Sequence, residues 1–312
     1  MKNIDYRHNM PLSIKAKLIQ STMDLMGLKK KIEKKMISND FEKDPTEPSK
    51  ALVNNFDIKL MQQKNRKIWI VSPKVSKTDV VILYLHGGGY MANITKEHWR
   101  LIEALINITN ATIVVPDYPL VPESSCKEIY DFTESLYERL IIDYPKQRII
   151  FIGDSAGGGL AFGFVQHLRN EQKKQPEQII LLSPWLDVSM NNPKIKLIDE
   201  SDKMLSIKGL RNAGKKYAGN LDLKDYRVSP IYGDLTELCQ LSIFTGTNDL
   251  LDADAQKCKK LMKDQQINFN YFEYPQMFHD WVIISSLKET SDVITKVKGL
   301  IDNDARLINV EL

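Results

Sequence analysis

Cysteine is scarce in this chain of 312 residues, and this scarcity excludes two kinds of architecture. The three cysteines, Cys126, Cys239 and Cys258, are scattered and odd in number. A disulfide framework needs paired cysteines, and a cysteine metal site needs them closely spaced. The pattern fits neither, so we expect a protein of a reducing compartment.

The chain also lacks a large excess of charge and any long apolar run. Its formal net charge is +3, and no basic block is interleaved with aromatic residues, so we expect no nucleic-acid partner. No apolar run approaches the ~18 residues of a membrane span, and the N-terminus lacks the apolar core of a secretory signal. We therefore expect a soluble, cytoplasmic protein with no transmembrane segment.

Strand-like and helix-like segments alternate from about residue 55. The run Val80–Leu85 is apolar without polar alternation, which indicates a strand buried on both faces of a mostly parallel sheet. Predicted strands cover residues 56–61, 67–72, 80–85, 112–116, 148–152, 178–182, 241–245 and 268–274. Predicted helices cover residues 96–108, 127–142, 158–171, 253–266 and 289–301. The pattern predicts an α/β fold with helices on both faces of the sheet.

Two segments depart from this alternation. Residues 14–37 have apolar side chains at helical spacing among many lysines, which predicts a basic amphipathic helix. We expect its apolar face to pack on the protein, the alternative being a membrane surface. Residues 184–230 contain no clear strand. We expect an N-terminal helical flank over residues 1–50, a core domain over residues 51–312, and a cap insertion at about 187–228.

The segment Gly153–Gly157 places a serine in a chemically informative setting. Ser155 lies in a G-x-S-x-G turn between the predicted strand 148–152 and a predicted helix. Such a turn, a nucleophile elbow, raises the hydroxyl above the sheet, and its glycines keep side chains out of the way. Ser155 is therefore a candidate nucleophile.

A serine hydroxyl needs a base, and only five histidines are available. His8 lies in the N-terminal flank, His98 and His167 fall within helical patterns, and His86 precedes three glycines. His279 alone lies late in the chain, just after the last predicted strand. In folds with a nucleophile elbow, the catalytic residues follow one another along the chain as serine, acid and histidine, so His279 is the candidate base.

The acid that orients the histidine is expected at the end of an earlier strand. Asp249 follows the strand 241–245 in a loop, and it is our candidate. Asp252 and Asp254 are nearby rivals, but Asp252 suits the N-cap of a following helix and Asp254 suits its first turn. Asp280 is a weaker rival, because a neighbour in sequence needs an awkward turn to reach the ring of His279.

A glycine-rich loop follows the strand 80–85. Bare amides at Gly87 and Gly88 could donate to an oxyanion, and the amide of Ala156 would add a third donor. A phosphate-binding loop fits poorly, because neither Gly-Lys-Ser/Thr nor the G-x-G-x-x-G spacing is present. We therefore predict an oxyanion hole of Gly87, Gly88 and Ala156.

With these motifs the chain resembles the hormone-sensitive-lipase-like family of α/β-hydrolases, from about Val80 to the C-terminus. The motifs are His86–Gly89, Gly153–Gly158, Asp117–Glu123, Ser183–Asp187 and Ser229–Pro230. The resemblance implies an eight-stranded, mostly parallel sheet with helices on both faces and a helical cap. Pro119 and Val121 depart from the family pattern, as does Leu238–Gln240, which puts local loop shape in doubt.

The resemblance and the motifs together predict a serine carboxylesterase for small, mainly short-acyl esters. Ser155, Asp249 and His279 would be its catalytic residues, and it would need no metal or organic cofactor. The same residues suit an amidase or a deacetylase of a small metabolite. A non-catalytic ligand receptor is a rival of another class, although such proteins typically lose part of the triad. A homodimer is a further expectation, since some relatives pair through the last strand and helix.

Overall fold

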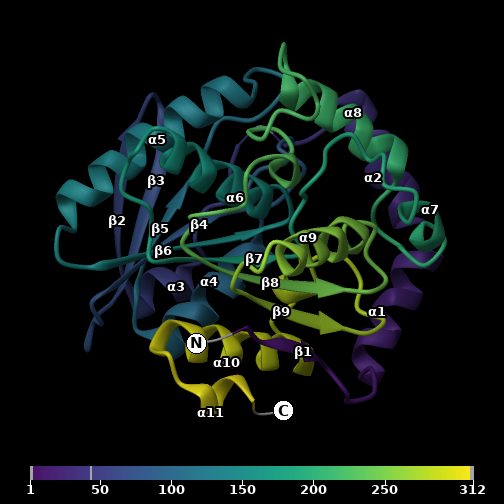
Figure 1. Ribbon diagram of the computed structural model, residues 1–312. Coiled ribbons are helices and arrows are strands. Elements are labelled where there is room, and N and C mark those ends of the chain that lie inside the picture. The colour runs from purple at the N-terminus through teal and green to yellow at the C-terminus, as the bar shows by residue number, and fades with distance from the viewer. Residues whose placement is uncertain (1–2, 43, 310–312) are drawn as a thin grey trace.

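The computed structural model describes residues 3–42 and 44–309, which form a twisted sheet between two layers of helices (Figure 1). Within these described residues the sheet has nine strands: β1 (Asp5–Arg7), β2 (Phe56–Gln63), β3 (Arg66–Pro73), β4 (Val80–Leu85), β5 (Thr112–Pro116), β6 (Arg148–Asp154), β7 (Gln178–Leu182), β8 (Gln240–Gly246) and β9 (Phe269–Tyr274). Their spatial order is β1-β9-β8-β7-β6-β4-β5-β3-β2. Among the strand pairs of the described residues, β2–β3 and β3–β5 are antiparallel and the others parallel, which confirms the predicted α/β fold with a mostly parallel sheet.

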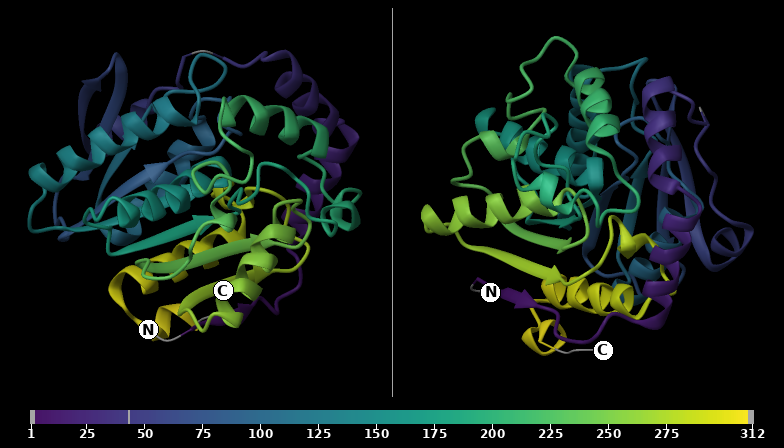
Figure 2. Two further views of the ribbon diagram at one scale, coloured as in Figure 1. Left: turned by 45° about the horizontal axis from the view of Figure 1, so that its top comes forward. Right: turned by 90° about the vertical axis from the view of Figure 1, so that its right-hand side faces the viewer.

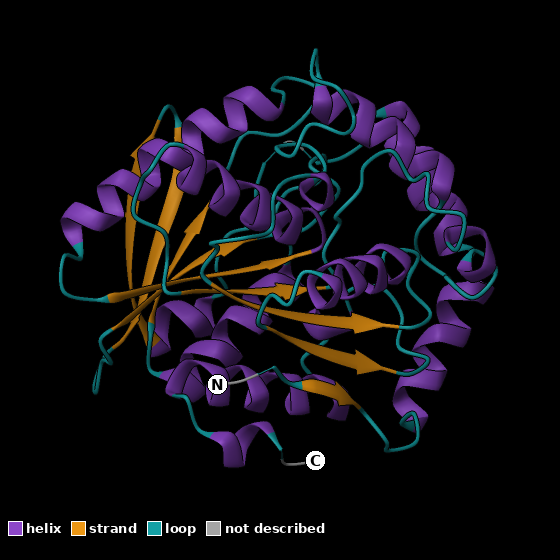
Figure 3. Ribbon diagram, in the orientation of Figure 1, coloured by secondary structure: helices purple, strands orange, loops and turns teal. Residues whose placement is uncertain are grey.

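The helices cover both faces of the fan of strands (Figure 3). They are α1 (Ile14–Leu25), α2 (Leu28–Ser38), α3 (Lys50–Asn55), α4 (Lys96–Thr109), α5 (Cys126–Asp143), α6 (Ser155–Asn170), α7 (Ile195–Ile198), α8 (Ile207–Ala218), α9 (Asp252–Asp264), α10 (Lys288–Asp302) and α11 (Ala305–Ile308), with short 3-10 helices η1 (Pro230–Tyr232) and η2 (Trp281–Ile283). One apolar core packs α5, α6 and α9 on the sheet, and the other packs α4 and α10 on the opposite face. Each predicted strand and helix of the core is present within a few residues of its expected bounds.

The expected number of eight strands was wrong by one. Residues 5–7 form β1, which pairs in parallel with β9 along Tyr271–Glu273. Three residues are too short for a sequence pattern, and this strand forms because β9 offers it an open edge. In consequence β9 is not an edge strand over those three residues. The expected homodimer would pair through the last strand, and β1 covers that edge here.

The N-terminal segment also differs from the single helix expected over residues 14–37. It divides into α1 and α2 at Gly27, whose φ of 59° lies in the left-handed region. Ile32 and Met36 of α2 pack on the core, as expected. Leu18 and Leu25 of α1 instead face solvent, so the expectation that the whole apolar face packs on the protein was wrong.

Candidate active site

Ser155 begins α6 directly at the end of β6, in a strained turn. Its φ of 48° is unusual for a residue with a side chain. The turn is possible because two flanking glycines lack a Cβ. A Cβ on Gly157 would lie 1.9 Å from the carbonyl oxygen of Leu85, and one on Gly153 would lie 2.5 Å from the carbonyl oxygen of Gly157. The G-x-S-x-G spacing is therefore a steric requirement of this turn.

Ser155, His279 and Asp249 meet at the carboxyl ends of the strands. The Nε2 of His279 lies 2.9 Å from Ser155 Oγ, and its Nδ1 lies 2.8 Å from Asp249 Oδ2. A carboxylate can only accept, so Nδ1 carries the hydrogen, and in the neutral form of the ring Nε2 is left to accept the serine hydroxyl. All three side chains are buried. The structure thus brings together the three residues that the sequence singled out.

The loop after β8 holds Asp249 from several directions. Its Oδ1 accepts a hydrogen bond from the amide of Leu251 at 2.9 Å. The buried carboxylate of Asp202, from the segment before α8, accepts the amide of Leu250 at 2.9 Å. Burial, and then the nearby charge of Asp249, raise the pKa of Asp202 to about 6. Sequence reasoning missed Asp202, because its partner lies 48 residues further along the chain.

The two rival acids after β8 have other partners. Asp252 accepts hydrogen bonds from Thr245 and Gln256, and Asp254 accepts one from Asn192. Asp254 lies in the first turn of α9 as expected, whereas the N-cap expectation for Asp252 was wrong, because Leu251 takes that position and Asp252 is the first residue of the helix. Of the acids after β8, Asp249 is therefore the one that orients the histidine ring.

Asp280 approaches the histidine from the other side. With φ at 53°, its backbone turns so that Oδ2 lies 3.1 Å from His279 Nε2, the nitrogen that faces Ser155. Burial, the largest effect, raises the pKa of Asp280 to about 6, although the charge of His279 opposes this. Burial by itself would lower the pKa of His279, but the charges of Asp249 and then Asp280 raise it well above its ordinary value. The predicted awkward turn exists, and it leads to the other ring nitrogen.

The oxyanion loop differs from the prediction at one glycine. The amide of Gly87 donates to Asp154 Oδ2 at 2.8 Å, so its hydrogen is already paired within the protein. Among the described residues, none accepts a hydrogen bond from the amides of Gly88 and Gly89. The amide of Ala156 lies in the first turn of α6, where a helix has no internal acceptor for it.

Asp154 is the buried anchor of this loop, and sequence reasoning did not identify it. Besides Gly87, its carboxylate accepts the hydroxyl of Tyr84 at 2.5 Å and lies 3.3 Å from Nε2 of His98. The Nδ1 of His98 accepts the amide of Thr95, so Nε2 carries the hydrogen that faces Asp154. The signal was the aspartate directly before Ser155. Its partners come from β4 and α4, which the sequence does not place beside it.

Helices α2 and α8 pack on one another (Figure 2). Asn212 of α8 donates to the carbonyl oxygen of Met36 at 2.7 Å. The side chain of Met36 is buried against Gly89, where its Cε lies 2.9 Å from the position of a Cβ. The N-terminal flank and the insertion before η1 therefore form one layer over this end of the sheet.

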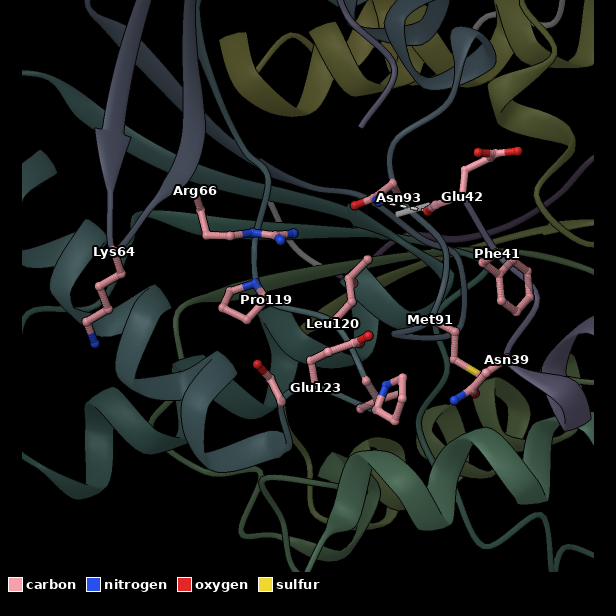
Figure 4. Close-up of a pocket in the computed structure, with 13 residues that line it drawn as sticks. Asn39, Phe41, Glu42, Lys64, Arg66, Met91, Asn93, Pro119, Leu120 and Glu123 are labelled. Carbon is pink, nitrogen blue, oxygen red and sulfur yellow. Dashed lines mark hydrogen bonds between the residues drawn. The ribbon is translucent and has the colours of Figure 1, made fainter. Parts of the chain in front are cut away.

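A surface hollow of about 410 Å³ lies next to this layer (Figure 4). Its lining includes Arg66, Pro119 and Glu123, and Asn93 donates there to the carbonyl oxygen of Glu42 at 3.0 Å. None of Ser155, Asp249 and His279 lines it, so this hollow does not contain the candidate site.

The fold and the site together define an enzyme of the carboxylic ester hydrolase class. Residues 82–283 match the family described as alpha/beta hydrolase fold. The chain is 30% identical over 201 residues to an acetyl-hydrolase of Streptomyces hygroscopicus, covering 64% of this chain and 67% of that protein.

Solved structures agree with this class. A candidate esterase from Staphylococcus aureus is 27% identical with a TM-score of 0.79, covering 88% of this chain and 91% of the other. An esterase of the bacterial hormone-sensitive lipase family shares the fold at 20% identity and a TM-score of 0.80, covering 96% of this chain and 100% of the other. The protein belongs to the α/β-hydrolase family, which confirms the resemblance at the level of this family.

Proposed function

We propose that the protein is a serine carboxylesterase that hydrolyses small, short-acyl esters through an acyl-enzyme. The observation that carries this proposal is the buried chain of two hydrogen bonds from Asp249 to His279 to Ser155. A serine hydroxyl is a weak nucleophile at neutral pH and becomes effective when an oriented base accepts its proton. This geometry supplies both the base and its orientation.

In the first half-reaction, His279 Nε2 takes the hydroxyl proton while Ser155 Oγ attacks the ester carbonyl carbon. Asp249 stabilises the imidazolium that forms. When the tetrahedral intermediate collapses, the carbon–oxygen bond to the alcohol breaks, and His279 gives its proton to the departing oxygen. In the second half-reaction, water replaces the alcohol, and the acid leaves as Ser155 regains its proton.

The negative oxygen of the tetrahedral intermediate needs donors that are in place beforehand. We assign this role to the amides of Gly88, Gly89 and Ala156. Gly87 is omitted from the predicted set, because Asp154 already accepts its hydrogen bond. In this assignment Gly87 supports the loop, and its neighbours contact the substrate.

The preference for short acyl groups is supported by the aromatic packing behind the oxyanion loop. Tyr90 directly follows the three glycines. Its ring is stacked on those of Tyr217 and Trp185, with distances between ring centroids of 3.6 and 5.7 Å. All three side chains are fully buried, and in this proposal they close the space that a long acyl chain would enter. The acetyl-hydrolase among the relatives agrees with a small acyl group. We propose that residues 1–50 and about 187–228 form the cap that limits the substrate.

Replacement of the nucleophile tests the mechanism. We expect Ser155→Ala to lower kcat on p-nitrophenyl acetate by ~10³-fold or more. We also expect a fluorophosphonate probe to label the wild-type protein and not the variant. A folded Ser155→Ala protein with near-normal turnover would refute the assignment of Ser155 as nucleophile. A folded wild-type protein that resists labelling would favour the alternative of a non-catalytic ligand receptor.

Two substrate series test the specificity. Activity on p-nitrophenyl esters should fall as the acyl chain lengthens beyond a few carbons. An aryl formamide, compared with p-nitrophenyl acetate, separates an esterase from an amidase. Higher kcat/KM on the formamide, or on long acyl chains, would overturn the substrate part of the proposal and leave the nucleophile in place.

A further inference from the structure

Helix α1 presents three large apolar side chains to solvent on one side, with Ser21 between two of them. Ile14, Leu18 and Leu25 are 78%, 62% and 90% exposed. At about 100° per residue they project within roughly 40° of one another, so they share one side of the helix. Single exposed apolar residues are ordinary, but three large ones on one helix face mark an interaction surface.

This face is not needed to attach α1 to the protein. The opposite side of the helix carries Ala16, Ile19 and Met23, which pack on the core below the sheet. The amphipathic helix is thus already bound by its inner face. The outer apolar residues have a separate reason to be there, because each of them leaves apolar surface in water.

Helix α2 continues the same side of the molecule with positive charge. Figure 2 shows α1 and α2 one after the other along one edge of the protein. Lys30, Lys31, Lys34 and Lys35 are exposed on α2, and none forms an ion pair with a described residue. Residues 10–40 contain seven lysines and three acidic residues, a net charge of +4, while the whole chain carries +3. The positive charge of the protein is therefore concentrated in this segment.

We propose that the outer face of α1 and α2, defined by Ile14, Leu18, Leu25, Lys30 and Lys34, docks on the surface of an anionic phospholipid membrane. Leucine side chains that enter the headgroup region and lysines that contact anionic headgroups are the two contributions that hold an interfacial helix. A protein partner of neutral charge would leave the lysines unmatched. Within residues 3–42 and 44–309 no helix could cross a bilayer, so the contact is peripheral.

Docking by this face would hold the active-site layer close to the lipid. The α2 helix that carries the exposed lysines also carries Met36, whose side chain covers Gly89 of the oxyanion loop. An ester partitioned in the membrane would then reach the protein on the side of this layer. The docking itself does not depend on turnover or on the proposed substrate.

Vesicle sedimentation tests the proposal with the full-length protein. Ether-linked phospholipids contain no carboxylic ester, so hydrolysis cannot change the vesicles during the measurement. We expect wild-type protein to sediment with vesicles of phosphatidylcholine and phosphatidylglycerol, and to stay in solution with phosphatidylcholine alone. High salt should weaken the binding, because lysine contributions are screened.

Two double variants separate the apolar and the basic contribution. Leu18→Glu with Leu25→Glu, and Lys30→Glu with Lys34→Glu, should each lower the partition coefficient at least about tenfold. The matched control is Ile142→Glu with Lys146→Glu on the far side of the protein, where Ile142 is also highly exposed. This control changes the charge by three units and should bind as the wild type does.

Three outcomes would overturn the proposal. The wild type could remain in the supernatant with anionic vesicles, or the control could lose as much binding as the α1 and α2 variants. Alternatively, the α1 variant could convert a dimer to a monomer in gel filtration without changing vesicle binding, which would make this face a contact between two copies. Turnover of a soluble ester by all three variants confirms that they are folded.

Discussion

Asp154 offers the sharpest test of how the oxyanion loop is held. Its buried carboxylate accepts from Gly87, Tyr84 and His98 at 2.8, 2.5 and 3.3 Å. Asp154→Ala removes the acceptor for all three donors at once. Asp154→Asn keeps one oxygen for Gly87 and His98, while the hydroxyl of Tyr84 can rotate to accept from the new amide. The pair therefore separates loss of charge from loss of hydrogen bonds.

The expected magnitudes follow from these contacts. A buried donor without a partner costs about 1–3 kcal/mol, so Asp154→Ala should lower the free energy of unfolding by about 3–5 kcal/mol. It also releases Gly87, beside the proposed donors Gly88 and Gly89. Because loss of one oxyanion donor costs about 10²–10³-fold in kcat, we expect kcat/KM to fall by about 10²-fold. Asp154→Asn should cost about 1–2 kcal/mol and about tenfold in kcat/KM or less.

The assay combines urea unfolding with turnover of p-nitrophenyl acetate at a temperature where both variants are folded. The order wild type, Asn, Ala should hold in both measurements. If Asp154→Ala keeps wild-type kcat/KM, the hydrogen bond to Gly87 does not position the loop. If the Asn variant falls as far as the Ala variant, the charge of Asp154 matters and its hydrogen-bond geometry does not.

Three other features give independent expectations. Asp280→Asn removes a negative charge beside His279, which lowers the pKa of His279. The neutral, basic form of the ring then persists to lower pH, so the acidic limb of the profile of kcat/KM against pH should move to lower pH. A limb that stays in place or moves to higher pH contradicts this. Lys296→Met removes the Nζ that lies 2.6 Å from the fully buried Asp292 and leaves this carboxylate with the hydroxyl of Tyr274 and the ring of His8, 3.6 Å away. Urea unfolding should show a loss of about 3 kcal/mol, and a loss below about 1 kcal/mol is incompatible with a strong Lys296–Asp292 pair. Gly157→Ala places a Cβ 1.9 Å from a backbone oxygen of β4 and should abolish soluble, active protein. Expression and turnover measurements check this, and a soluble, active variant would show that the turn can relax.

The order of elements could be predicted because the core strands are apolar and short. A buried parallel strand such as β4 needs an apolar side chain on both faces, and the sequence displays that directly. Strand β1 could not be predicted, since its three residues have no pattern of their own. The break at Gly27 was also missed, because the lysine-rich helical periodicity continues on both sides of it.

Parts of the candidate site could also be predicted from local sequence, and other parts could not. Ser155 was evident from five adjacent residues, since a strained turn imposes its requirement for glycine locally. Chain order then singled out Asp249 and His279. The role of Asp154 as anchor, and the replacement of Gly87 by Gly89 among the proposed donors, depend on contacts between β4, α4 and β6. No spacing in the chain records those contacts.

The sequence by itself determined the family, the elbow, and the candidate residues Ser155, Asp249 and His279, because each of these is encoded in short motifs or in their order. Only the tertiary structure decided which amides remain available to a substrate, where Asp280 lies, and which apolar residues of α1 face solvent. Those facts depend on packing between segments far apart in the chain. Periodicity indicates that a helix has two faces, and only its neighbours decide which face is buried.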